Sequence, residues 1–600
     1  MKKRNFFLGL SMLFLLASCG AGNTIHDDNN HDDDITDDVT TDGEDNSFDE
    51  LVTHDEEVEI PETYKEYVSG AITEAGNYYL KGDYDTVDIT TKNIEVFIFL
   101  DGVNITSSTS YAFGSSKAIT LHLVLLNDSV NTISNDVLDT NAFHVKGNVY
   151  ISGKGTLNIT SKQKNGLKVS KDLFVYEGVT LNVKGYNHAI TARSIVSKGA
   201  SISVISETKD GLQLECESDI TTYTKDQGFA YLKDTKFTSD TYGDGIQADT
   251  YVYISGGEYD ITTHGEFVSY STTNMSTYGL ERDDFKYVKS GSDYKRVATD
   301  EIRQLSSSYY ALANSVKGIK VGPIEVDTDN DDVDDLTVTT GEYEVYIAHL
   351  ASLTINSFDD CVHANYGKTT VDSANLILST YDDGLHADYD LLVNNSSISV
   401  NKSYEGLEGA TITVNGENTN IIANSEDDGI NAASDLSSTN TITINDGYIR
   451  VFASGDGLDA NTALYLNGGT VIVEGPGRGN GSLDSDNIYF NGGTIFACST
   501  NGMTERMSAT QYTFLYSGST IAANTKVSVV DSNNNALFSY TLKQSCSQII
   551  FSHKDMKKGQ SYKVVAGSTT LVTITMTSTL VTSGLSSGGP GGGGHGPGGW

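Results

Sequence analysis

Positive charge and tryptophan are scarce in this sequence. Lys and Arg total 39 of 600 residues against 80 Asp and Glu, so the formal net charge is −41. A surface that binds DNA or RNA needs clustered positive charge, and nucleic acid is therefore excluded as a partner. Tryptophan occurs once, at Trp600, which disfavours any binding mode that needs a row of exposed indoles.

Cysteine and long apolar runs are also rare. Four of the five cysteines, Cys216, Cys361, Cys498 and Cys546, are widely scattered, and no CxxC pair occurs. This excludes a zinc knuckle and a thioredoxin motif, and leaves buried apolar cysteines or a disulfide framework as alternatives. After the N-terminal apolar run at 6–16 no long apolar stretch follows, so no further membrane span is expected.

The N-terminus has the pattern of an export signal. Three basic residues at 2–4 precede the apolar run, and Ala17-Ser18-Cys19 follows it. A cysteine after a small residue resembles a bacterial lipobox, which implies a lipoprotein signal peptide at 1–18 and a palmitate-type lipid on Cys19. The expected location is the outer face of the bacterial cell membrane, reached only through the lipid anchor. Ordinary signal cleavage is the alternative.

Two segments of biased composition flank the remainder. Residues 20–62 are rich in Asp and Glu and contain no Lys or Arg, so 19–67 is predicted to be an extended acidic tether. Residues 583–600 form a Gly-rich tail. Between these ends lie most of the 59 Gly, few of the 5 Pro and abundant Thr, Ser, Asn and Val. That composition is typical of an all-β chain with many tight turns.

Two patterns recur between the flanks. One is an alternating strand, an Asn/Gly bend and a second alternating strand, as in 464–473 and 488–496. The other is acid-Gly-apolar-x-Ala, whose glycines Gly384, Gly406 and Gly429 are spaced by 22 and 23 residues. Its clearest copies are Asp244–Ala248, Asp383–Ala387, Asp428–Ala432 and Asp456–Ala460. A fixed period of this length indicates a solenoid.

The period predicts which solenoid it is. About 22 residues hold three short strands and three turns at about 3.3 Å per residue. We therefore expect an all-β fold, a right-handed single-stranded parallel β-helix over 68–500. Insertions at 215–243 and 262–316 interrupt the period, with a short helix predicted at 299–314. Residues 501–582 lose the repeat and are predicted to form a small C-terminal β cap over the open last turn.

Stacking the repeats creates columns of oxygen ligands. Equivalent residues of successive turns lie about 4.8 Å apart, so carboxylates stacked in this way repel unless a cation lies between them. Ca²⁺ takes oxygen ligands at about 2.4 Å and fits this spacing, whereas a hydrated edge without an ion is the alternative. The predicted calcium ligands are Asp359, Asp360, Asp382, Asp383, Asp388, Glu405, Glu408, Asp427, Asp428, Asp456, Asp459 and Asp484. The outward column is expected to run His363, His386, Glu408, Asn431, Asp459, Asp484.

The segments 403–409, 427–433 and 455–461 resemble bacterial carbohydrate-binding-domain proteins, whose folds are similar to pectate lyases. The resemblance covers roughly 68–500 and is most specific over 355–500. It implies a right-handed parallel β-helix with Ca²⁺ that binds cellulose or pectin-like polysaccharide without a common catalytic activity. The N-terminal turns lack the acid, as at Asn165-Gly166, which argues against Ca²⁺ there.

Three functions remain open from the sequence. Non-catalytic polysaccharide binding by a monomer is the first, with Phe358, Tyr381, Tyr404, His363 and His386 as candidate sugar contacts. The first three recur every 23 residues, and structural stacking is the alternative for them. A lyase needs a basic side chain to remove the proton alpha to the uronate carboxylate. The candidates Lys168 and Lys320 are expected to lie far along the coil from the acids. A hydrolase with paired carboxylates, or a structural or adhesive surface protein, completes the alternatives.

Overall fold

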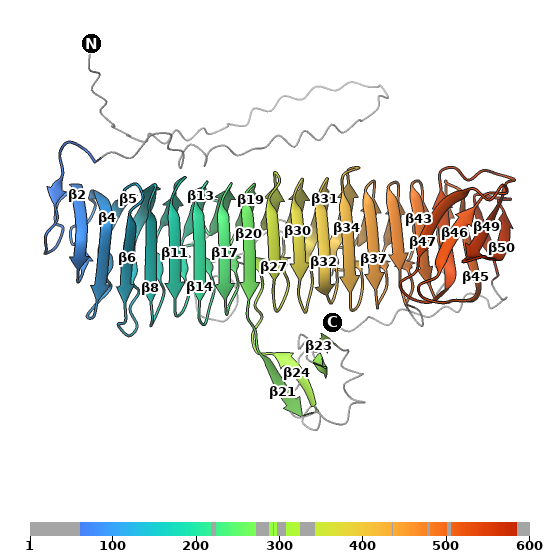
Figure 1. The fold of residues 1–600 in the computed structure, drawn as a ribbon, viewed down its shortest axis with the longest axis horizontal. Helices are drawn as coiled ribbons and strands as arrows, with labels where there is room; N and C mark the ends of the chain where they lie inside the picture. Colours follow the sequence, from blue (N-terminus) through green and yellow to red (C-terminus); the bar gives the residue numbers. More distant parts are fainter. Residues whose placement is uncertain are drawn as a thin grey trace, which may run out of the picture. The chain divides into compact units, whose positions relative to one another are not determined.

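The computed structural model describes residues 60–217, 224–271, 287–291, 293–296, 308–323, 342–434, 436–476, 480–500 and 506–584. The predicted signal peptide with Cys19, most of the acidic tether and nearly all of the Gly-rich tail lie outside these residues. No helix occurs in the described part of the chain, which is built from strands and turns (Figure 1). Within that part, no helical segment is long and apolar enough to cross a bilayer.

Most strands belong to one 43-stranded sheet that coils into a solenoid with three faces. Face A holds β1 (Lys65–Glu66), β2 (Gly76–Tyr84), β4 (Glu95–Ser107), β5 (Phe113–Leu125), β7 (Phe143–Gly153), β10 (Asp172–Val175), β13 (Ser194–Lys198), β16 (Phe229–Lys233), β19 (Tyr251–Ser255), β26 (Glu344–Ala348), β29 (Lys368–Asp372), β31 (Leu385–Asn394), β33 (Leu407–Asn415), β36 (Thr441–Ile444), β39 (Ala463–Leu466), β42 (Ile488–Phe490) and β44 (Met507–Ala509). Face B holds β6 (Val130–Asn135), β8 (Thr156–Ser161), β11 (Thr180–Gly185), β14 (Ser201–Ser206), β17 (Lys236–Thr241), β20 (Glu258–Thr263), β27 (Ser352–Asn356), β30 (Asn375–Ser379), β32 (Ser397–Ser403), β34 (Asn420–Ser425), β37 (Tyr448–Ala453), β40 (Thr470–Glu474) and β43 (Thr494–Ser499). Face C holds β3 (Val87–Asp88), β9 (Leu167–Val169), β12 (Ile190–Ala192), β15 (Leu212–Leu214), β18 (Ile246–Ala248), β25 (Ile319–Val321), β28 (Val362–Ala364), β35 (Ile430–Ala432), β38 (Leu458–Ala460) and β41 (Leu483–Ser485).

Pairing along each face is parallel from one turn to the next. On face C, for example, β28 pairs in parallel with β25 before it and with β31 after it. Four long strands, β5, β7, β31 and β33, continue through the corner from face C to face A. The predicted parallel β-helix is therefore confirmed.

The alternation in each strand places one set of apolar side chains inside the coil. In β34 the burial alternates along the strand, and Ile421 and Ala423 point into the continuous core. The glycine of the motif is required by close approach at the corner. A Cβ added to Gly384 would lie 2.5 Å from the carbonyl oxygen of Gly406 in the next turn, so a larger residue would push the turns apart.

The structure corrects two sequence-based boundaries. The segment 215–243 is not wholly an insertion, because β16 and β17 lie within it and pair with their neighbours as ordinary rungs. Within 215–243 the extra sequence therefore precedes β16, which begins at Phe229. The helix predicted at 299–314 is also wrong over Ser308–Leu312, which forms β24 of a separate antiparallel sheet. The adjacent aromatic residues Tyr309 and Tyr310 favour a strand over a helix.

That separate sheet lies in the predicted insertion at 262–316, which we call the arm. It consists of β21 (Phe267–Ser271), β22 (Tyr287–Ser290), β23 (Asp293–Arg296) and β24, in the order β21-β24-β22-β23. The arm leaves the solenoid after β20 and is drawn in green below it (Figure 1).

The C-terminal residues cover the last turn. Strand β48 (Cys546–His553) pairs antiparallel with β43 of the solenoid and with β45 (Thr513–Ile521), which also pairs with β51 (Leu580–Ser583). A four-stranded sheet packs beside them, formed by β46 (Lys526–Val530), β47 (Ala536–Thr541), β49 (Ser561–Ala566) and β50 (Thr569–Thr575). This cap has its own hydrophobic core. Antiparallel pairing ends the parallel coil, so no further rung can be added to that edge.

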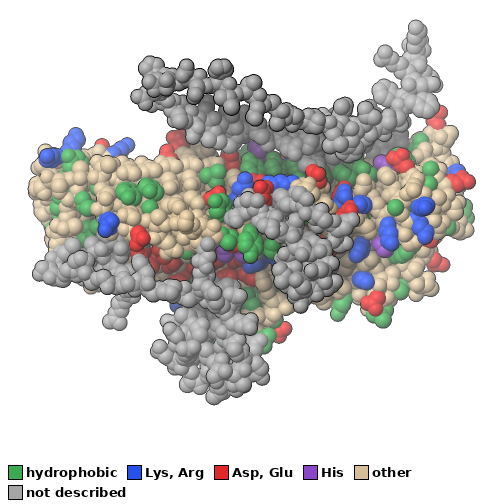
Figure 2. Space-filling view, turned by 180° about the vertical axis from the view of Figure 1, so that it is seen from behind, with side chains coloured by type: hydrophobic (Ala, Val, Ile, Leu, Met, Phe, Trp, Pro, Cys, Tyr) green, Lys and Arg blue, Asp and Glu red, His purple; other side chains and the backbone are tan. Residues whose placement is uncertain are grey.

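Uncharged groups dominate the visible surface. Seen from behind, most of the solenoid surface is tan, from backbone and uncharged polar side chains, with scattered charged groups (Figure 2). This agrees with a chain in which only 20% of residues are charged. The concentration of acidic side chains at one corner of the coil is therefore a local feature that needs its own explanation.

Candidate functional site

The acids of the repeated motif lie at the turn between face B and face C, which we call the acid corner. Here a side-chain oxygen of one turn accepts a hydrogen bond from the backbone N–H of the next. Asp360 Oδ1 accepts from Asp383 N–H at 3.1 Å, and Asp383 Oδ1 accepts from Glu405 N–H at 3.1 Å. Asn141 does the same for Asn165 at 3.3 Å. The first role of the corner residue is therefore structural, because it satisfies a buried amide.

The outward column on face C has the order expected from the sequence. Directly paired residues along successive turns are Lys320, His363, His386, Glu408, Asn431, Asp459 and Asp484. One correction concerns Lys320, which lies in the turn next to His363 and not far from the acids. Strands β25 and β28 are adjacent rungs although a long stretch of sequence separates them.

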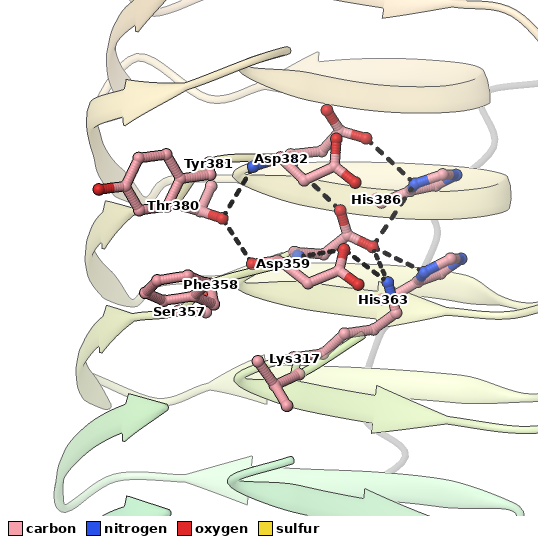
Figure 3. Close-up of polar contacts among 12 residues, drawn as sticks. Lys317, Ser357, Phe358, Asp359, His363, Thr380, Tyr381, Asp382 and His386 are labelled. Carbon is pink, nitrogen blue, oxygen red and sulfur yellow. Dashed lines mark hydrogen bonds and ion pairs between the residues drawn. The ribbon is translucent and has the colours of Figure 1, made fainter. Parts of the chain in front are cut away.

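The first part of the corner, from Asp359 to Asp388, contains cationic side chains, and we call it the histidine segment. Lys317 Nζ lies 3.0 Å from Asp359 Oδ1 and 2.5 Å from Asp360 Oδ2, and all three residues are buried (Figure 3). Burial works to lower the pKa of Lys317, but Asp360 and Asp359 raise it well above its ordinary value. Lys317 is thus a buried ammonium ion that neutralises this end of the corner.

Two stacked histidines border the same acids. The rings of His363 and His386 lie 4.1 Å apart at 10°, on the opposite side of the acid cluster from Phe358 and Tyr381 (Figure 3). His386 Nδ1 lies 3.3 Å from both Asp383 Oδ2 and Glu408 Oε2. Burial works to lower the pKa of His386, but Glu408 and the neighbouring aspartates raise it well above the ordinary histidine value.

The second part of the corner, from Glu405 to Asp484, is the carboxylate segment. Asp428, Asp456 and Asp459 bring three carboxylates within 4.8 Å of one another. Burial, followed by repulsion from Asp427, Asp459 and Asp456, raises the pKa of Asp428 well above its ordinary value. Repulsion between neighbouring carboxylates is therefore an electrostatic feature of this group.

An asparagine adds a further oxygen to the carboxylate segment. Asn431 is 8% exposed, and its Nδ2 donates to Glu405 Oε2 at 2.8 Å. Its Oδ1 is buried and has no hydrogen-bond partner among the described residues. A buried carbonyl-type oxygen without a donor costs free energy, and a bound cation is one way to satisfy it.

Two of the candidate sugar-binding rings are covered by the arm. Phe358 and Tyr381 pack 5.2 Å apart, and Phe267 of the arm contacts both rings. Lys402 Nζ lies 3.6 Å from the centre of the Tyr381 ring, whose hydroxyl donates to Asp293 at 2.8 Å. Their faces are occupied by protein groups, which supports the structural alternative for these two rings. Tyr404 takes part in the corner through its backbone, which bonds to Asp382 and Asp427.

Sequence reasoning missed an aromatic column on face A. Rings follow one another in register on β4, β5, β7 and β10, with centroids 4.1, 4.7 and 4.6 Å apart. Its members are Phe97, His122, Tyr150 and Phe174, and a second run comprises Tyr231, Tyr253 and Tyr346. The signal was present as an aromatic in the middle of successive outer strands. Because the rings stack on one another, their faces are covered by neighbouring rings, and Phe174 and Tyr231 are buried.

Comparison with known proteins places the chain in a family. A model described as carbohydrate-binding domain-containing protein matches residues 68–380 and 374–583. The chain belongs to this family. The resemblance inferred from the sequence motifs is therefore confirmed, and the match extends into the cap.

Other comparisons are more distant. Among solved structures the chain is similar to the polysaccharide lyase-like protein from C. thermocellum, in a gadolinium derivative. The identity is 19% and the TM-score 0.26, over 34% of this chain and 83% of that one. No curated protein matches the chain significantly.

Proposed function

We propose that this protein binds acidic, pectin-like polysaccharide without transforming it, through Ca²⁺ held by the carboxylate segment. Membership of a carbohydrate-binding family supports the ligand class. The observation that carries the proposal is the group Asp428, Asp456 and Asp459, which offers three carboxylates within 4.8 Å of one another. Oxygen-only donor sets are those that Ca²⁺ prefers.

The donor chemistry limits where Ca²⁺ fits. In the histidine segment Lys317 already compensates Asp359 and Asp360, and two imidazoles contribute nitrogen donors, which Ca²⁺ disfavours. We therefore restrict the calcium proposal to the carboxylate segment, where the buried Oδ1 of Asn431 lacks a partner. Asp359, Asp360, Asp382, Asp383 and Asp388 drop out of the calcium set on this argument.

In this proposal the carboxylates hold Ca²⁺, and the ion contacts the sugar chain. Bound Ca²⁺ supplies the positive charge that an acidic sugar chain needs, since a protein of net charge −41 otherwise repels it. Asp459 and Asp484 follow one another in the outward column, which runs parallel to the coil axis, and both are partly exposed to solvent. A polymer lying along this axis would meet equivalent groups on successive turns.

A pull-down with polygalacturonate tests the proposal. We expect binding in Ca²⁺, loss of binding in chelator, and loss in the double variant Asp456→Asn plus Asp459→Asn. Asp260→Asn removes an exposed acid on β20 outside the corner and serves as the matched control. Binding that persists in chelator, with the circular dichroism spectrum unchanged, contradicts the calcium bridge. Cellulose is the second arm, and chelator-resistant cellulose binding would assign the site to a neutral glycan.

A lyase is the second candidate function, and one observation favours it. Lys320 lies directly opposite His363 in the outward column, so a basic side chain borders the acids. A lyase removes the proton alpha to the uronate carboxylate and leaves an unsaturated product. Release of ultraviolet-absorbing product from polygalacturonate by the wild type, and not by Lys320→Ala, would replace the non-catalytic proposal.

We further propose that the protein acts at the cell surface, anchored by a lipid on Cys19. The N-terminal pattern of the sequence supports this location. Cys19→Ala should move the protein out of the membrane fraction. Unchanged fractionation would refute the anchor, and binding to another surface protein but to no glycan would favour an adhesive role.

A further inference from the structure

The two stacked histidines share one carboxylate on their outer edge. His363 Nε2 and His386 Nε2 lie 3.1 and 3.2 Å from the same oxygen, Asp388 Oδ1. The other oxygen of Asp388 accepts a hydrogen bond from Tyr366 N–H at 2.8 Å, which fixes the carboxylate. An ionised carboxylate accepts hydrogen bonds and cannot donate them. Both Nε2 atoms are therefore assigned as N–H donors to Asp388.

This assignment leaves the inner ring nitrogens to be explained. His363 Nδ1 lies 2.8 Å from Asp360 Oδ2, yet it is buried and makes no hydrogen bond among the described residues. His386 Nδ1 lies 3.3 Å from two carboxylates, Asp383 and Glu408. A lone pair this close to a carboxylate is repelled unless positive charge lies between them.

The carboxylates around His386 favour a proton on one inner nitrogen when no ion is bound, but protons on both inner nitrogens at once are unfavourable. They would create two imidazolium ions with their rings face to face at 4.1 Å, and like charges at that distance repel. Lys317 Nζ already pairs with Asp359 and with Asp360 Oδ2, the oxygen that faces His363 Nδ1. A single divalent ion would satisfy both nitrogens and the facing carboxylates at once.

We propose that His363 Nδ1 and His386 Nδ1, with Asp360 and an oxygen of Asp383 or Glu408, bind a divalent transition ion of the zinc and cobalt class. These nitrogen and oxygen atoms form two overlapping groups, each within 4.8 Å, that share His386. Imidazole nitrogen selects such ions over Ca²⁺. Asp388 would accept the Nε2–H groups of both histidines and orient their rings, because metal-bound histidines commonly donate their other N–H to a carboxylate. This site is separate from the proposed calcium group and goes beyond polysaccharide binding.

Titration of the metal-free, untagged full chain with Co²⁺ tests the proposal. We expect one tight equivalent with visible absorption bands, displaced by Zn²⁺ and not by a large excess of Ca²⁺. His363→Gln and His386→Gln should each weaken Co²⁺ binding at least 100-fold. Asp388→Asn keeps an acceptor oxygen but removes its charge, and should weaken binding about 10- to 100-fold.

Two matched controls make the result specific. His264→Gln removes an exposed histidine that pairs with Asp240 at 2.5 Å, and should leave Co²⁺ binding unchanged. Asp456→Asn plus Asp459→Asn should also leave it unchanged while abolishing Ca²⁺-dependent glycan binding, so the two proposals fail separately. Absence of a stoichiometric Co²⁺ site in the folded wild type, or equal loss in the His264 variant, would overturn the inference.

Discussion

The two segments of the acid corner share a sequence motif but differ in how their charge is balanced. In the histidine segment Lys317 and two imidazoles lie within 4 Å of the carboxylates. In the carboxylate segment the carboxylates of Asp428, Asp456 and Asp459 lie within 4.8 Å of one another, and burial together with their repulsion raises the pKa of Asp428. The motif therefore sets the position of the acids, while residues outside its fixed positions decide their electrostatics.

The largest effect is expected from removing the internal cation. Lys317→Met leaves Asp359 and Asp360 buried without their ammonium partner, and should lower the free energy of unfolding by about 3–5 kcal/mol. Urea denaturation measures the change. Lys320→Met, on the neighbouring outward position, should cost less than about 1 kcal/mol. Equal losses for the two variants would contradict the special role of the buried lysine.

A calcium effect should follow in the other segment. A ligand at a hundredfold excess over its dissociation constant stabilises the folded state by about 2.7 kcal/mol. Ca²⁺ should therefore raise the melting temperature of the wild type, and Asp456→Asn plus Asp459→Asn should abolish the shift. His363→Gln should retain it, because that residue belongs to the histidine segment. A shift that survives the double aspartate variant would place Ca²⁺ elsewhere.

Asp244 occupies the acid position of an earlier turn, and its buried carboxyl should make the free energy of unfolding depend on pH. Burial, and then repulsion from Asp210, raises the pKa of Asp244 to about 7, against about 3.9 in an unfolded chain. The folded state thus holds this proton more tightly, so stability is greatest below about pH 4 and falls as pH rises toward 7.

The substitution Asp244→Asn should remove that dependence. An amide oxygen can still accept the hydrogen bond from Lys317 N–H, as Asn141 does for Asn165. At pH 8 the variant should be about 1–3 kcal/mol more stable than the wild type, with no gain at pH 4. Denaturation curves at the two pH values measure this, and a gain of equal size at both would show that charge is not the cause.

The smallest effect is expected where the arm meets the corner. Lys402 Nζ pairs with Asp293 Oδ2 at 2.8 Å, and both side chains are partly exposed. Asp293→Asn should therefore cost less than about 1 kcal/mol globally. Amide hydrogen exchange should nevertheless rise in β22 and β23, because the arm loses a polar link to Lys402 and Tyr381. Exchange that stays unchanged would assign arm docking to its aromatic contacts alone.

The period made much of this predictable from the sequence. The motif recurs every 22 or 23 residues from His363 to Asn431, so that part of the outward order followed from counting, and the motif itself marked Asp459 in the next turn. Lys317 was missed because its turn has Lys317-Gly318-Ile319 in place of an acid before glycine, and because a long stretch of sequence separates β25 from the next rung. The arm lies outside the repeat, so its contact with Tyr381 could not be predicted from the period.

The bond from each corner side chain to the amide of the following turn has a consequence for how such a chain changes length. Each turn supplies the acceptor for the next and receives one from the turn before, as Asp360, Asp383 and Glu405 do in sequence. A whole turn can therefore be added or removed, because each turn contributes one acceptor and one backbone amide. Excising 384–405 would join Asp383 to Gly406 and let Asp383 accept from the amide of a later corner, whereas deletion of half a turn would leave an acceptor and an amide unpaired. Growth and shrinkage of this coil proceed in complete turns.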